Sequence, residues 1–154
     1  MPEQLIEIKG LDELINRFID LGNDMFSRNL MAEIGTYLIA QIQLRTSEGT
    51  DAAGMPFKPY SPKYALFREE TGHSAGTVNL FYTGSMMSAM TFEADVDQVR
   101  VFFMNTKDKS DASNPLKAFA LNQERQFFAM SVEEQEAILE LIEEYISNIL
   151  EGED

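Results

Sequence analysis

Catalytic chemistry in this chain would have to come from few side chains, because the sequence contains no cysteine and a single histidine, His73. His73 lies in the stretch EETGHSAG, beside Ser74 and near Glu70, which are the residue types of a Ser-His-acid triad. Such a triad depends on geometry rather than on nearness in sequence, and a glycine-flanked loop holds side chains poorly for this work. We therefore expect an ordinary exposed loop histidine and no catalytic residues.

The other patterns that could carry chemistry are incomplete. The carboxylates of Glu69/Glu70 and of Glu143/Glu144 are neighbours in sequence, so on a helix the two members of each pair point to different sides. The glycines follow neither the spacing of a phosphate-binding loop nor that of a dinucleotide-binding fingerprint. One histidine without cysteine cannot build a multi-histidine or thiolate metal site. The sequence predicts no cofactor, no metal and no enzymatic activity.

Length and net charge further limit the functional classes of protein to which this chain could belong. The 154 residues, 44% of them hydrophobic, predict a single domain over 1–154 with a core of its own. The net charge of −14, from 12 Lys+Arg against 26 Asp+Glu, argues against a protein that binds nucleic acid or an anionic membrane. No stretch approaches the roughly 20 apolar residues of a membrane span, and the start MPEQLIEIKG lacks a signal-peptide plan. We expect a protein made and kept in a cytosol.

The first third of the chain predicts a short strand and a helical pair. Residues 4–9 alternate closely enough to indicate a strand that Gly10 ends. The helical pair is expected over 11–45, with Ser27 as the N-cap of its second helix. The apolar residues of the first helix recur at helical spacing, as Leu11, Leu14, Ile15, Phe18, Leu21 and Met25. Those of the second are Leu30, Met31, Ile34, Leu38 and Ile42.

Periodicity is lost after residue 45, and an extended loop rich in proline, glycine and aromatic residues is predicted over 46–79. A loop of about 30 residues inside a compact domain is usually functional or disordered. Its aromatic residues argue against simple disorder, because they favour burial. We expect this loop to become ordered on a partner.

Residues 80–104 predict a β-hairpin in which Val99, Val101 and Phe103 share one face. A polar loop is expected over 105–115. The last helix is predicted over 131–150, because Ser131 and Glu134 have capping-box spacing ahead of an apolar stripe. Its many glutamates are typical of a solvated face.

These elements predict an α+β fold. We expect a small, mostly antiparallel sheet packed against the N-terminal helical pair and the acidic C-terminal helix, with the long loop between them.

Three blocks, in this order, resemble the phage virion morphogenesis or tail completion proteins of the Mu G-like kind. Residues 51–61 (DAAGMPFKPYS) are similar to that family's Asp-Pro-Asp-Gly, aromatic, Pro-Leu segment after a long helix. Residues 80–90 (LFYTGSMMSAM) are similar to its Leu, Thr-Gly-x-Leu, Ser pattern. Residues 125–131 (RQFFAMS) are similar to its Arg-Pro-Phe-Leu-Gly-Leu-Ser stretch before an acidic helix. The departures are Ala52 and Ala53 for Pro and Asp, Phe57 for Trp, Met86 for Leu, Ala89 for Ser and Gln126 for Pro.

The resemblance implies a non-enzymatic structural protein of the virion, placed at the phage neck or tail end and assembled in the bacterial host cytoplasm. It would act in tail completion, tail termination or head-tail joining, as a hexameric ring around the DNA passage. Its partners would be other copies of itself and tail-tube or head-connector proteins, while DNA passes without specific binding. The interface residues expected on this basis are Phe57, Pro59, Tyr60, Tyr64, Phe67, Thr83, Gly84 and Met87.

The alternative from another class is an acidic DNA mimic or regulatory binding protein. In that case the glutamate-rich C-terminal helix would itself engage a basic partner.

Overall fold

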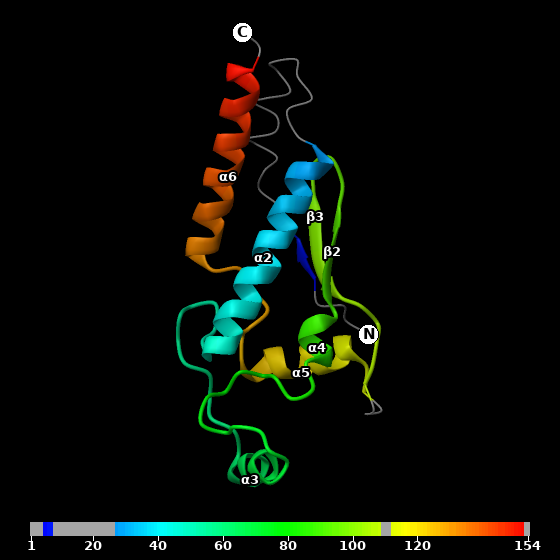
Figure 1. Cartoon of the computed structure of the whole chain (residues 1–154), viewed down its shortest axis with the longest axis vertical. Coiled ribbons are helices and arrows are strands. Elements are labelled where there is room, and N and C mark those ends of the chain that lie inside the picture. Colours follow the sequence, from blue (N-terminus) through cyan, green and yellow to red (C-terminus); the bar gives the residue numbers. More distant parts are fainter. Residues whose placement is uncertain (1–4, 8–26, 109–111, 153–154) are drawn as a thin grey trace.

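The computed structural model describes residues 5–7, 27–108 and 112–152. The predicted first helix over 11–25 lies outside the described residues. The fold is α+β, as the sequence predicted, with helices packed on a small antiparallel sheet (Figure 1). Figure 1 places α6 and α3 toward opposite ends of the long axis.

The sheet has the order β1-β3-β2, with antiparallel pairing throughout. Strands β2 (Met90–Ala94) and β3 (Val99–Phe103) form the predicted hairpin, and β1 (Ile6–Glu7) pairs with the other edge of β3. The side chains of Val99, Val101 and Phe103 are buried while Arg100 is exposed, which confirms the predicted alternation.

Helix α2 (Arg28–Glu48) is the second helix of the predicted pair. It begins where predicted, because the Ser27 side chain accepts a hydrogen bond from the Leu30 backbone N–H at 3.2 Å. It ends at Gly49, whose φ of 87° is the left-handed conformation that glycine adopts without strain. The buried face of α2 consists of the predicted apolar residues with Gly35 and Thr46.

The core lies between α2 and the sheet on one side and between α2 and α6 (Val132–Glu151) on the other. At Gly35 the helix approaches the sheet so closely that a Cβ atom there would lie 2.6 Å from Cγ of Phe92. Helix α6 begins with the predicted capping box, in which Ser131 and Glu134 exchange side-chain to backbone hydrogen bonds of 3.0 and 2.8 Å. It buries Ile138, Ile142 and Ile146 along one stripe.

The middle of the chain departs from the predictions in three places. The expected extended loop over 46–79 is wrong for residues 62–70, which form α3 (Pro62–Glu70) behind the N-cap Ser61. The expected hairpin region over 80–104 includes α4 (Ser85–Ser88) before its first strand. The predicted polar loop over 105–115 is wrong for its last two residues, because Asn114 and Pro115 begin α5 (Asn114–Glu124), a helix that the sequence did not predict.

A candidate assembly surface around Tyr60

The segments around residues 58–60, 80 and 125 are distant in sequence and meet around the ring of Tyr60. Arg125 donates hydrogen bonds from Nε to the Lys58 carbonyl (2.9 Å) and from Nη2 to the Pro59 carbonyl (3.1 Å). Its guanidinium carbon lies 5.5 Å from the centre of the Tyr60 ring. The Leu80 backbone N–H donates to the Tyr60 hydroxyl at 3.3 Å. Tyr60 therefore links its own segment to the segments around residues 80 and 125.

Arg68 on α3 is buried among aromatic rings. Its guanidinium carbon lies 4.8 Å from the centre of the Tyr60 ring, 5.9 Å from that of Tyr64 and 6.0 Å from that of Tyr82. It donates hydrogen bonds to two carbonyl oxygens, Ser74 O at 2.8 Å and Phe81 O at 2.9 Å. No carboxylate among the described residues forms an ion pair with it. The charge of Arg68 is thus held by carbonyl dipoles and ring faces.

An aromatic series extends from this centre along α3. The ring centres of Tyr60 and Tyr64 are 5.1 Å apart, those of Tyr64 and Phe67 are 6.0 Å apart, and those of Phe67 and Tyr82 are 5.8 Å apart. The series ends at His73, which stacks on Tyr82 at 4.2 Å. Tyr64 and Phe67 are both exposed, so this part of the series faces the outside of the molecule.

The eight predicted interface residues fall into three groups by exposure. Phe57 and Met87 are buried in the core of their own chain, and Met87 also lines an apolar groove beside this surface. Tyr60 and Gly84 are half-buried, and Gly84 precedes α4 with a φ of 82°. The exposed members are Pro59, Tyr64, Phe67 and Thr83. The structure brings the rings of Tyr60, Tyr64 and Phe67 together.

An apolar groove of about 900 Å³ lies beside the aromatic series, between the segment 80–87 and α5. Its apolar lining comes from Leu80, Met86, Met87, Ala120 and Leu121. Its polar edge is built by Asp108, which accepts hydrogen bonds from the Thr83 hydroxyl (3.1 Å) and from Lys117 Nζ (2.9 Å).

A second cavity, of about 340 Å³, adjoins the groove, because Tyr64, Leu80, Tyr82 and Leu121 line both. Arg68, Arg125 and Glu124 also line it. The two hollows together have three cationic side chains and two acidic ones, and the excess charge is positive.

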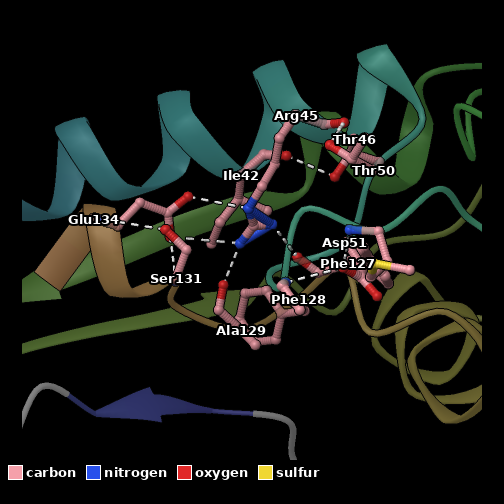
Figure 2. Close-up of polar contacts among 12 residues, drawn as sticks. Ile42, Arg45, Thr46, Thr50, Asp51, Phe127, Phe128, Ala129, Ser131 and Glu134 are labelled. Atoms are coloured by element: carbon pink, nitrogen blue, oxygen red, sulfur yellow. Dashed lines mark hydrogen bonds and ion pairs between the residues drawn. The ribbon is translucent and has the colours of Figure 1, made fainter.

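Arg45 on α2 organises the third block, residues 125–131 (Figure 2). Its Nε lies 3.0 Å from Oε1 of Glu134, its Nη1 donates to the Phe127 carbonyl at 2.8 Å, and its Nη2 donates to the Ala129 carbonyl. Burial lowers the pKa of the Arg45 guanidinium, and the carboxylates of Glu134 and Asp51 oppose that shift. These bonds hold the chain between α5 and α6 against α2.

His73 differs from the exposed loop histidine that we expected. It is half-buried, its Nε2 lies 3.0 Å from the Tyr82 carbonyl, and its Nδ1 lies 3.3 Å from the Thr71 hydroxyl. The Ser74 hydroxyl instead accepts a hydrogen bond from the Gly76 backbone N–H at 3.3 Å. The described contacts thus do not join His73, Ser74 and Glu70 into a triad.

The described part of the chain contains neither a cluster of metal ligands nor a membrane-spanning helix. No group of three or more His, Cys, Asp or Glu side chains gathers there in a way that could hold a metal ion. None of its helices is both long and apolar enough to cross a membrane.

Comparisons of the chain with protein-family models, curated proteins and solved structures gave no match.

Of the two arginines at the centre of this surface, the sequence singles out only Arg125, as the first residue of the block 125–131. Arg68 carries no sequence signal, because its hydrogen-bond partners are backbone carbonyl oxygens. Lys117 and Leu121 were also missed, since α5 was not predicted. Tyr82 lies in the block 80–90 but was not among the predicted interface residues. The signals that could have placed α3 are Ser61 at the N-cap with Pro62 directly after it, and the one-turn spacing of Tyr64 and Phe67.

Proposed function

We propose that this chain is a non-enzymatic structural subunit of a tailed-phage virion, at the neck or tail end. It acts in tail completion, tail termination or head-tail joining, and assembles as a hexameric ring around the DNA passage. Its partners are other copies of itself and the adjoining tail-tube or head-connector proteins.

The observation that carries the proposal is the convergence of the sequence blocks that resemble tail completion proteins. Blocks 51–61 and 125–131 are joined by the hydrogen bonds of Arg125 and by one from the Ala52 N–H to the Gln126 carbonyl at 3.2 Å. Blocks 51–61 and 80–90 are joined by the bond between Leu80 and Tyr60. The three blocks thus lie together in the fold, which supports a shared role for them.

The chemistry of that surface also supports a contact role. Aromatic residues are enriched in protein interfaces because they bury large areas at little cost in conformational entropy. Tyr64 and Phe67 are exposed beside a groove lined mainly by apolar side chains. Exposed apolar surface of this kind, with a polar edge, marks interaction sites in soluble proteins.

The acidic character suits a ring through which DNA moves. A lumen lined by carboxylates repels phosphates, so DNA would pass without specific binding. Phosphate or DNA binding by the isolated ring at low salt would contradict this part of the proposal.

A pair of matched variants on α3 tests the proposal. Y64A/F67A removes the two exposed rings, while Leu66→Ala removes an exposed apolar side chain from the same helix that has no ring contact. Native mass spectrometry would be run on each purified chain, alone and mixed with phage tails assembled without it. We expect wild type and Leu66→Ala to form rings or attach to tail ends, and Y64A/F67A to do neither while its circular dichroism stays native. A fully assembling Y64A/F67A would contradict the proposal.

The acidic mimic is the second candidate, favoured by the seven glutamates of α6, which has no Lys or Arg. It predicts that the chain captures a basic DNA-binding protein and ignores phage tails. The triple variant E140Q/E143Q/E144Q would then lose that capture. These three glutamates are exposed, so their replacement leaves the fold intact.

A further inference from the structure

The groove beside the aromatic series has the features of a site for an amphipathic acidic helix. It has an apolar lining, and Lys117 lies at its edge. The adjoining cavity adds Arg68 and Arg125, whose charges are buried and only partly matched by Glu124. A helix that fits this site needs an apolar anchor flanked by carboxylates.

Helix α6 exposes such a face. Val132, Leu139 and Leu150 are all exposed, and their separations of seven and eleven residues place them along one line of the helix. Leu139 is 48% exposed and has the exposed glutamates Glu136 and Glu143 one turn away on either side. Neither carboxylate has an ion-pair partner among the described residues, whereas Glu134 on the buried side pairs with Arg45.

We propose that Leu139 and its flanking glutamates on α6 of one copy dock into the groove between residues 80–87 and α5 of a second copy. Leu139 enters the apolar part of the groove, and Glu136 and Glu143 approach Lys117 and the arginine cavity. This inference rests on the proposed function, since it names the contact by which copies would assemble.

The placement of the two surfaces argues for a second copy as the occupant. In Figure 1, α6 packs on α2 and runs away from α5 and α3, toward the opposite end of the molecule. A chain therefore cannot dock its own α6 into its own groove. A contact between two different surfaces of identical subunits is head-to-tail, and repeating it closes a ring when the rotation allows.

Each half of the contact can be disabled by a substitution with a matched control. Leu139→Glu places a carboxylate at the anchor, and Asn148→Glu adds the same charge to an exposed position on another side of α6. Ala120→Glu fills the groove with an acid, and Gln123→Glu adds the same charge to α5 outside the groove. All four positions lie on helices, and neither Asn148 nor Gln123 lines the groove.

Self-association would be measured by analytical ultracentrifugation of the full chain. We expect Leu139→Glu and Ala120→Glu each to weaken it by about tenfold or more, because a leucine is no longer buried in the groove. The controls should keep wild-type association. Higher ionic strength should weaken wild-type association, because the carboxylate contacts are screened.

Mixing the two disabled variants gives the decisive measurement. Ala120→Glu retains an intact α6 and Leu139→Glu retains an intact groove, so one contact can form between them and none can follow it. Native mass spectrometry should show a 1:1 dimer of the mixture and no larger species. A mixture that stays monomeric would overturn the proposed pairing.

The remaining outcomes separate this inference from the proposed function. If the wild type forms rings and both disabled variants form them equally well, the docking contact is wrong while the ring assembly stands. If the wild type does not self-associate at any concentration, a second copy is not the occupant. The tail-attachment experiment with Y64A/F67A then decides the proposed function separately.

Discussion

Arg45 on α2 and Glu134 on α6 form a buried ion pair, with 3.0 Å between Nε and Oε1. Glu134 also accepts a hydrogen bond from the backbone N–H of Ser131, so one carboxylate joins the start of α6 to α2. Arg45 in turn binds the carbonyls of Phe127 and Ala129. The pair therefore fixes the path of the chain between α5 and the start of α6. Its loss should lower the stability of the whole fold.

Replacing Arg45 by leucine should lower the free energy of unfolding by about 3–5 kcal/mol, because it leaves the Glu134 carboxylate buried without its partner. Arg28→Leu on the same helix is the matched control. Arg28 lies 3.9 Å from Asp95 with both side chains largely exposed, and its loss should cost about 1 kcal/mol or less. Urea unfolding followed by circular dichroism measures both. Equal losses in the two variants would show that the buried pair adds nothing special.

The capping serines offer a second comparison. Ser131→Ala removes the side chain that accepts the Glu134 backbone N–H, and should cost about 1 kcal/mol of stability. Ser113 stands at the N-cap of α5 without a side-chain cap bond, and its hydroxyl is buried with no partner among the described residues. Ser113→Ala should therefore be neutral or stabilising. Thermal unfolding of both variants tests the difference, and a larger loss at Ser113 would contradict it.

The elements that the sequence predicted are those in which buried apolar residues recur at a regular spacing. Helices α2 and α6 combine apolar periodicity with the N-caps Ser27 and Ser131, and β3 alternates strictly. Helices α3 and α5 also begin at serines, Ser61 and Ser113, but they have no repeating buried apolar face. The one buried residue of α3 is Arg68, and those of α5 are Asn114 and Ala118. Burial of polar and small residues leaves no hydrophobic pattern to detect.

The candidate site was predictable only in its aromatic part. Tyr60, Tyr64 and Phe67 stood out because aromatic residues between turn formers favour burial or contact. The arginines that hold these rings bind carbonyl oxygens of distant segments, as Arg125 does at Lys58 and Pro59. No local sequence rule encodes such a bond, since every residue carries a carbonyl group.

Tyr37 on α2 should make stability fall at alkaline pH. Burial raises its pKa above the ordinary value of 10.0, with smaller contributions from the carboxylates of Glu134 and Glu140. The folded protein then keeps the phenol proton where the unfolded chain loses it. The resulting stability is present below pH 10 and is lost as pH rises through the folded pKa. Tyr37→Phe should remove this part of the pH dependence, and unfolding measured across this range in both proteins would show it. Identical slopes would contradict the assignment.

Gly35 should tolerate no larger residue, because α2 touches the Phe92 ring at that position. A Cβ there would meet Cγ of Phe92 at 2.6 Å, so Gly35→Ala should cost about 1–3 kcal/mol despite the better helix propensity of alanine. Gly76→Ala is the control, since its nearest neighbour would be Ser74 Oγ at 3.9 Å. Phe92→Ala removes Cγ and the rest of the ring, so it should relieve the clash and make G35A less costly in that background. Urea unfolding of the double-mutant cycle measures the coupling, and an unchanged cost would place the strain elsewhere than at the Phe92 ring.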